Sequence, residues 1–294
     1  MATKTGAYVL TKKGEAFIRA ACNFTEDKYG NTLLRGKNKN GALPYCDPIT
    51  PATKIWESHA KYNGNAITTN QQLGEALISW YNKYGNEYKM DANVMAAQAF
   101  QESGYYLWNY PQTSTASGIS QFITDAVFDV ITSKNYSNYV APMTDAEINA
   151  ILKDTTGERK TYGNTYDVSS ATGKKNRPIM HQNICDNPEI MIKAQFRYMK
   201  IIASYGKTSL TSQVLFGYSR GFGHIQDTYS DSIAHATNSE GYQNEGIDYV
   251  FKIFRYLGYP QTINGVRGMY FGYDDLGVDQ YPNPNFDDLT ADAR

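Results

Sequence analysis

The sequence is poor in cysteine, has almost no net charge and contains no long apolar run. Its 3 cysteines are too few for a disulfide framework, and its 4 histidines lack a ligand spacing such as H-E-x-x-H, so we expect no metal and no cofactor. A net charge of -1 gives no electrostatic reason to expect nucleic acid as a partner. No stretch is long enough to span a membrane. Cys22 and Cys46 either pair in an oxidising compartment or stay reduced.

Tyrosine, in contrast, is abundant. The chain has 25 tyrosines, and aromatic residues make up 14% of its 294 residues. Aromatic rings stack on sugar faces, but they fill ordinary cores and protein interfaces as well. The length allows one large domain with extensions or two small domains.

Apolar periodicity predicts a mainly α protein with polar, irregular ends. Residues 1–65 form an N-terminal extension with a short helical stretch, and residues 259–294 form a C-terminal tail. The domain itself covers 66–258 and contains a polar segment, 133–186, which we expect to be a long inserted loop or lid. Helices are predicted over 14–22, over 71–85 with an end at Gly85, over 92–102 with Asp91 as its N-cap, over 122–131, from Pro188 to about Ser204, over 211–218 and over 247–257. The glycine-rich segment around Tyr218 is expected to interrupt the helix predicted over 211–218.

A glutamate stands at the end of the helix predicted over 92–102. Met95, Ala99 and Glu102 recur at i, i+4 and i+7, so the carboxyl group shares a face with apolar side chains, and Gly104 then ends the helix. Partial burial at the negative end of a helix should raise the pKa of this carboxyl group. Because cleavage of a glycosidic bond requires a protonated acid, we interpret Glu102 as a general acid. The alternative is a solvated glutamate that only ends the helix.

The glutamate belongs to the first of several motifs that occur along the chain in a characteristic order. They are Glu102-Ser103-Gly104, the glycine turn Gly118-Ile119-Ser120-Gln121, Asn187-Pro188-Glu189, the segment Gly217-Tyr218-Ser219-Arg220-Gly221-Phe222-Gly223, and Glu245 with Tyr249-Val250. Each motif is weak alone, but together they resemble the soluble lytic transglycosylase domain, the lysozyme-like module that cuts peptidoglycan. The resemblance covers about residues 73–257 without the insertion, and it implies a lysozyme-like α+β fold.

The resemblance also implies a reaction on peptidoglycan glycan strands. Glu102 would protonate the β-1,4 glycosidic oxygen between N-acetylmuramic acid and N-acetylglucosamine. The acetamido group of the muramic acid would stabilise the cationic centre. The ionised Glu102 would then take the proton of the C6 hydroxyl group, which closes a 1,6-anhydro ring.

The same resemblance implies the substrate-binding residues. They are Ser103, Ser114, Gly118, Gln121, Tyr218 and Ser219. Thr113 is an equal alternative to Ser114. Simpler roles are open for three of them, because Ser103 could cap the helix end, Gln121 could cap its own turn and Tyr218 could fill a core.

Two other functions stay open. A hydrolytic muramidase would need a second carboxylate; Asp125 and Asp129 follow the glycine turn, but their spacing does not place them opposite Glu102. A non-catalytic structural protein of a virion could keep the fold without cutting glycan. Gly217 and Ser219, which stand where the family usually has Ala and Asn, keep this third function open.

The start of the chain is polar and has no apolar segment of the kind found in a secretory signal. Host enzymes of this family are usually exported. We therefore expect a bacteriophage protein, carried in the tail or interior of the virion, that acts on the host cell wall in the periplasm. Its terminal extensions would contact other virion proteins.

Overall fold

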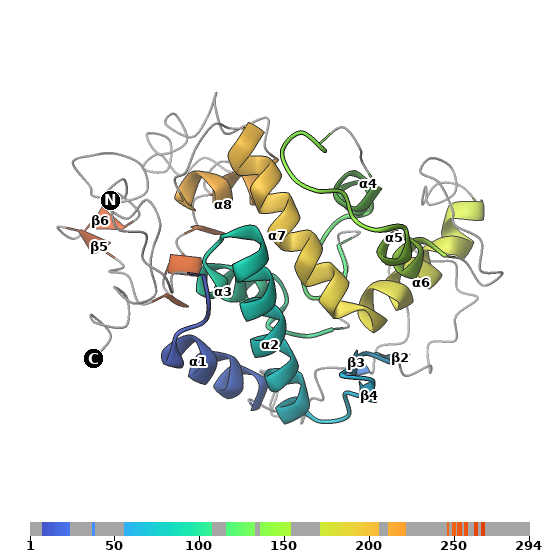
Figure 1. Ribbon diagram of the computed structural model, residues 1–294, viewed down its shortest axis with the longest axis horizontal. Helices are drawn as coiled ribbons and strands as arrows, with labels where there is room; N and C mark the ends of the chain where they lie inside the picture. The colour runs from blue at the N-terminus through green and yellow to red at the C-terminus, as the bar shows by residue number, and fades with distance from the viewer. Residues whose placement is uncertain are drawn as a thin grey trace. The chain divides into compact units, whose positions relative to one another are not determined.

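The computed structural model is mainly helical, which confirms the expected mainly α class (Figure 1). It describes residues 8–23, 37–38, 56–107, 116–132, 136–153, 171–205, 211–221, 246, 249–250, 252–254, 256–257, 262–263 and 266–267. The helices are α1 (Lys12–Asn23), α2 (Asn70–Tyr88), α3 (Ala92–Ser103), α4 (Thr124–Thr132), α5 (Asp145–Leu152), α6 (Ala171–Asp186), α7 (Pro188–Tyr205) and α8 (Thr211–Arg220). None of these helices is long and apolar enough to cross a membrane.

The described strands are short antiparallel pairs. β1 (Lys37–Asn38) pairs with β2 (Trp56–Glu57), β3 (Lys61–Tyr62) with β4 (Asn65–Ala66), and β5 (Thr262–Ile263) with β6 (Val266–Arg267). The turn between β3 and β4 consists of Asn63 and Gly64, with φ values of 50° and 79°. Positive φ at both residues is the requirement of a tight type I′ hairpin, and Asn-Gly is the preferred pair for it.

The chain forms two compact units. Unit 1 consists of Met1–Gly14, Tyr81–Gln101 and Phe196–Arg294, and unit 2 consists of Glu15–Trp80 and Glu102–Gln195. The boundaries expected at residues 65 and 258 stay predictions.

Unit 1 contains an aromatic cluster around Phe196. The rings of Tyr81, Tyr84 and Tyr88 lie 6.1, 6.3 and 6.0 Å from the Phe196 ring. All four side chains are buried, so the abundant tyrosines serve, at these positions, to fill a core.

Side chains of α2 and α3 also hold the first described residues of the chain in unit 1. The Leu10 N–H donates to Asn82 Oδ1 at 2.6 Å, and the Thr11 N–H donates to Asn93 Oδ1 at 3.0 Å. Asn93 Nδ2 donates in turn to the carbonyl group of Val9 at 3.2 Å. These bonds satisfy backbone groups that no regular element pairs.

The end of α2 differs from the prediction, because the helix passes Gly85 and ends at Tyr88. A side chain at Gly85 would collide with the carbonyl oxygen of Tyr8, so this glycine permits a close approach of two backbone segments. Lys89, with φ of 55°, and the bond from the Met90 N–H to the Gly85 carbonyl at 3.1 Å form the actual helix end.

The insertion also differs from the prediction of a loop, because α5 and α6 lie within residues 133–186. Thr144 and Glu147 form a capping box at the start of α5, and Ile148, Ile151 and Leu152 are buried. The polar composition of the segment concealed this local signal. Asn183 Nδ2 donates to the carbonyl groups of Ile151 at 3.0 Å and Lys153 at 2.8 Å, which ties α5 to α6.

An ion pair adds a second attachment of α5, to α7. Lys193 Nζ lies 2.7 Å from Glu147 Oε1, and the two side chains are only 15% and 20% exposed. Burial acts to raise the pKa of Glu147, but hydrogen bonds from Lys193 and Thr144 outweigh it and the pKa is lowered. The insertion is therefore fixed to its unit at α5.

Two glycines of α2 should respond oppositely to alanine. Gly85→Ala should lower the free energy of unfolding by about 2 kcal/mol, because the carbonyl group of Tyr8 has to move. Gly74→Ala should raise it by roughly 0.5–1 kcal/mol, because alanine favours helix and the new methyl group lies an acceptable 3.7 Å from Cys22 Cβ. Urea unfolding measures both. Equal effects of the two changes would contradict the close approach at Gly85.

The Glu147 pair should make stability depend on pH. The folded-state pKa of Glu147 lies below its ordinary value of 4.5, so the ionised group stabilises the fold above that pH, and the contribution is lost as the pH falls through the lowered pKa. Glu147→Gln should cost about 1 kcal/mol at pH 7 and less below pH about 4, by urea unfolding at both pH values. Glu75→Gln, at the exposed Arg19 pair, is the control and should cost less than about 0.5 kcal/mol.

Candidate functional site

Glu102 lies in the last turn of α3. Asp91 caps the start of this helix, as predicted, because its Oδ1 accepts a hydrogen bond from the Asn93 N–H at 2.8 Å. Met95 and Ala99 are buried, and Glu102 is half-buried. The carboxyl group is therefore at the border of the apolar face that the sequence placed it on.

The backbone reverses directly after Glu102. Gly104 and Tyr105 have φ values of 60° and 65°, so two consecutive residues are left-handed. Ser103 is 4% exposed, and its Oγ accepts a hydrogen bond from the Tyr105 N–H at 3.1 Å. In this structure the Ser103 hydroxyl group thus caps the helix end, which was the simpler of its two expected roles.

The glycine turn is a second left-handed segment. The Ser117 N–H donates to the Phe122 carbonyl at 3.2 Å, which closes the base of the turn. Gly118 has φ of 71° and Gln121 has φ of 49°. Gln121 Nε2 donates to the Gly118 carbonyl at 2.8 Å, so its amide nitrogen holds its own turn. The positive φ of Gln121 is strained for a residue other than glycine, so the surrounding structure has to enforce it. Strained residues of this kind are common at binding sites.

Residues of α6 and α7 contact the glycine turn. A side chain at Gly118 would collide with Cγ2 of the buried Ile184. Ser120 is fully buried, and its Oγ donates to the Met191 carbonyl at 3.2 Å. Neither contact could be predicted from the sequence, because nothing local to Ile184 or Met191 marks them as neighbours of the turn.

The tyrosine motif lies inside a helix. Gly217, Tyr218 and Ser219 belong to α8, whereas the sequence suggested that the motif interrupts this helix. Gly221, with φ of 91°, follows its last residue. The Tyr218 ring lies 5.3 Å from the Tyr198 ring at 58°, and Tyr218 is half-buried.

Tyrosines near the end of the domain contact α3 in unit 1. Gln98 Nε2 donates to the Tyr249 hydroxyl oxygen at 3.1 Å, and the Tyr256 hydroxyl group donates to Gln101 Oε1 at 3.1 Å. The Tyr256 ring also packs edge-on against Phe100 at 5.0 Å. Two glutamines in an apolar helix are the sequence signal for such partners, because buried amide groups need hydrogen bonds.

The predicted site residues fall into three groups. Glu102, Ser103, Gly118 and Gln121 belong to unit 2, and Tyr218 and Ser219 belong to unit 1. Ser114, like its alternative Thr113, lies outside the described residues.

Two more carboxylates of unit 2 lie on α4, directly after the glycine turn. Partial burial and the charge of Asp125 raise the pKa of Asp129. Hydrolysis of a glycosidic bond normally requires a second carboxyl group opposite the acid.

Comparison with known proteins found no matching family model, no matching curated protein and no matching solved structure. Within the described part of the chain, no group of three or more His, Cys, Asp and Glu side chains could hold a metal ion.

Gly118 should tolerate alanine less well than another left-handed glycine. Gly64→Ala, in the β3–β4 turn, has open space around the new methyl group and should cost about 1 kcal/mol for its φ alone. Gly118→Ala should cost about 2 kcal/mol more in urea unfolding, because its methyl group meets Ile184. Adding Ile184→Ala to Gly118→Ala should cost less than Ile184→Ala does in the parent. Additive effects would refute the contact.

Proposed function

We propose that the protein is a peptidoglycan lytic transglycosylase, with Glu102 as its catalytic acid and base. The observation that carries the proposal is the placement of this carboxyl group. It is half-buried at the end of a helix, it precedes a left-handed reversal, and it shares a unit with the strained turn of Gln121. The order of the motifs, which resembles that of the soluble lytic transglycosylase domain, supports the same reaction.

A single carboxyl group suffices for this reaction because the substrate closes on itself. Glu102 donates its proton to the glycosidic oxygen, and the bond to the anomeric carbon breaks. The acetamido oxygen stabilises the positive charge at that carbon. The C6 oxygen of the muramic acid then bonds to the anomeric carbon, and Glu102 accepts the proton of that C6 hydroxyl group. The acid is thereby returned to its protonated starting state.

The glycan would lie along the polar groups of the two left-handed segments. Gln121 Nε2 donates to the Gly118 carbonyl within the turn, and an amide oxygen such as Gln121 Oε1 is the kind of acceptor that a sugar hydroxyl group requires. Gly118 lets the backbone approach the sugar without a side chain. Tyr218 and Ser219 of unit 1, and Ser114, keep the binding roles that the resemblance implies.

Hydrolysis by a muramidase is the second candidate, and the acids of α4 favour it. Asp129 has a raised pKa, and Asp125 is an exposed carboxylate one helical turn before it. If either acid activates a water molecule opposite Glu102, the product is a reducing muramic acid end instead of an anhydro ring.

We place the activity in a bacteriophage virion, in the tail or the interior, from which the protein would open the host cell wall. The polar composition of residues 1–65 and 259–294 supports docking to other virion proteins. Detection of the protein in lysates of infected cells but never in purified particles would contradict this setting.

The activity is tested by digestion of purified peptidoglycan, with mass spectrometry of the released sugar ends. The parent should produce 1,6-anhydro-muramic ends, and Glu102→Gln should lower the rate about a hundredfold or more, because the amide cannot donate an acid's proton. Glu87→Gln, an exposed glutamate of α2, is the matched control and should leave the rate unchanged.

The identity of the product separates the candidates. Reducing ends that Asp125→Asn or Asp129→Asn abolishes would replace the transglycosylase with a hydrolase. Binding of peptidoglycan by the parent without any product would leave a non-catalytic virion component that keeps the fold.

A further inference from the structure

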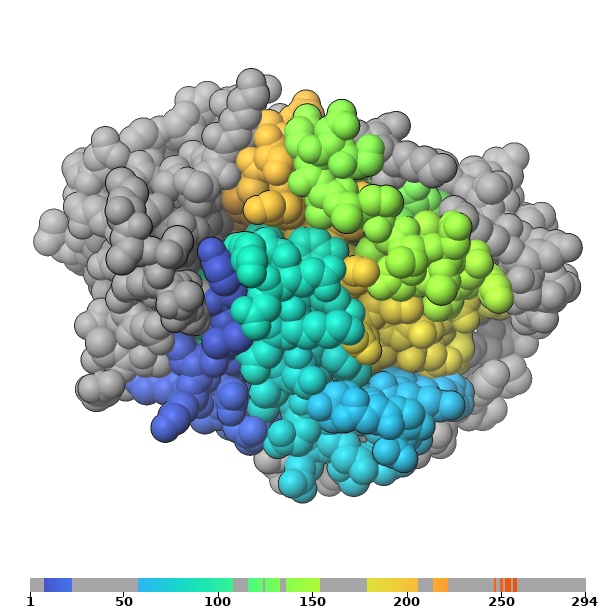
Figure 2. Space-filling view, viewed as in Figure 1, coloured from blue at the N-terminus to red at the C-terminus, as the bar shows by residue number. Residues whose placement is uncertain are grey.

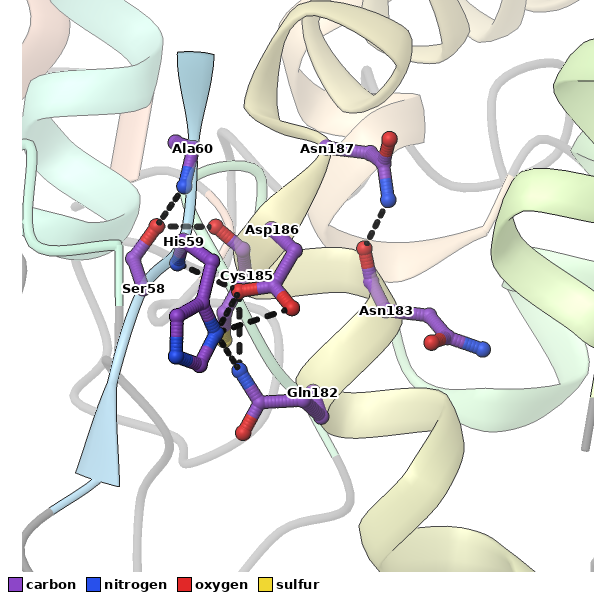
Figure 3. A network of polar contacts seen from close by, with 8 residues as sticks. All are labelled: Ser58, His59, Ala60, Gln182, Asn183, Cys185, Asp186 and Asn187. Carbon is purple, nitrogen blue, oxygen red and sulfur yellow. Dashed lines mark hydrogen bonds and ion pairs between the residues drawn. The ribbon is translucent and has the colours of Figure 1, made fainter. Parts of the chain in front are cut away.

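The last turn of α6 holds residues 58–60, which precede the β3–β4 hairpin (Figure 3). Ser58 Oγ donates to the Cys185 carbonyl at 2.6 Å and accepts from the Ala60 N–H at 3.1 Å. The His59 N–H donates to Asp186 Oδ1 at 2.6 Å. Figure 2 shows residues 58–66 (light blue) at the surface beside the yellow residues of the α6–α7 junction.

Asp186 is the centre of this network. Besides the His59 N–H, its Oδ1 accepts from Gln182 Nε2 at 2.8 Å, and His59 Nδ1 lies 3.2 and 3.3 Å from its two carboxylate oxygens. An acid at a helix C-terminus is opposed by the helix dipole, so these donors are what keep the carboxylate in place. Asp186 is 23% exposed, whereas the His59 ring is 71% exposed.

The same turn of α6 supports the glycine turn. Ile184, two residues before Asp186, fills the space where a side chain of Gly118 would be. The Asn187 N–H donates to the Ile184 carbonyl at 3.3 Å, and its carbonyl accepts from the Met191 N–H at 3.2 Å. The Met191 carbonyl in turn accepts from Ser120 Oγ. The neighbours of Asp186 in the chain therefore reach the glycine turn in two ways, by the packing of Ile184 against Gly118 and by the bonds that run from Asn187 through Met191 to Ser120.

We propose that Asp186 is a positioning residue for Gln121, acting through Ile184 and Met191. Its bonds to His59 fix the direction in which α6 ends, and that direction sets the position of Ile184 under Gly118. Since a close-packed contact cannot stretch, a shift of the α6 end has to move the glycine turn or open a gap beneath it. The surface segment 58–66 is thereby coupled to the turn that contains Gln121, the residue proposed to bind the glycan. The consequence for glycan cleavage rests on the proposed function.

Hydrogen–deuterium exchange with mass spectrometry tests the coupling without any assay of activity. Asp186→Ala removes both carboxylate oxygens that bond His59 and Gln182, and it should speed amide exchange in 117–122 about fivefold, the equivalent of one ordinary hydrogen bond. Asp186→Asn keeps one oxygen acceptor and should restore most of the protection. His59→Ala changes an exposed ring, so it leaves folding intact and should give a smaller increase in the same peptide.

Two controls separate positioning from general loosening. Lys61→Ala, an exposed side chain of β3, should leave exchange in 117–122 unchanged. Exchange in residues 12–23, which form α1, should stay the same in every variant. Faster exchange confined to 58–66 and the end of α6, with 117–122 unchanged in both Asp186→Ala and His59→Ala, would overturn the proposal.

Peptidoglycan digestion tests whether Asp186 also affects glycan cleavage. Asp186→Ala should raise KM more than it lowers kcat, because Glu102 stays while the sugar-binding turn loosens, and Asp186→Asn should recover the parent KM. A parent that binds peptidoglycan but yields no product would defeat the proposed function and leave the exchange result to decide the coupling. An active parent with unaltered exchange in the variants would defeat the coupling alone.

Discussion

The last turn of α6 is the constraint on which the rest of unit 2 depends, because its consecutive residues hold different segments. Asn183 bonds to the carbonyl group of Ile151 near the end of α5, and Ile184 packs against Gly118 of the glycine turn. The Cys185 carbonyl accepts a hydrogen bond from Ser58 Oγ, and Asp186 Oδ1 accepts one from the His59 N–H. Burial, and then the charge of Asp186, raise the pKa of the Cys185 thiol far above its usual range, so it stays protonated and inert as packing. A single helical turn thus fixes the insertion, the hairpin and the candidate site against one another.

Residues with left-handed backbone are next to the candidate site residues of unit 2 in the chain. Gly104 and Tyr105 follow the proposed acid, and Gly118 and Gln121 bound the glycine turn. Tyr105 and Gln121 adopt this conformation without being glycines, which costs about 1 kcal/mol or more for each. The surrounding packing has to supply that free energy, and at the glycine turn Ile184 packs against Gly118 while Ser120 bonds to the Met191 carbonyl. The proposed reaction uses the rigidity that results, because a sugar held in one position needs a turn that does not move.

Much of the helical framework followed from local chemistry. Asp91 before α3, Pro188 at the start of α7 and Gly104 after α3 marked helix limits correctly, since a cap is formed by residues within four positions of each other. The insertion was misjudged although Thr144 and Glu147 carry such a signal, because its polar composition outweighed a motif of four residues. The roles of Gln98 and Gln101 escaped for a different reason, as their tyrosine partners lie more than 150 positions away.

The sequence by itself determined the helical class, most helix limits and the position of Glu102 at the border of a buried face, because these depend on period and capping within one element. Only the tertiary structure decided that Gly85 serves a close approach and not a helix end, that Ile184 limits Gly118, and that His59 meets Asp186 across 127 positions. Such contacts join side chains that no periodicity relates. They form because the fold brings these residues next to one another, and close packing then decides which atoms meet.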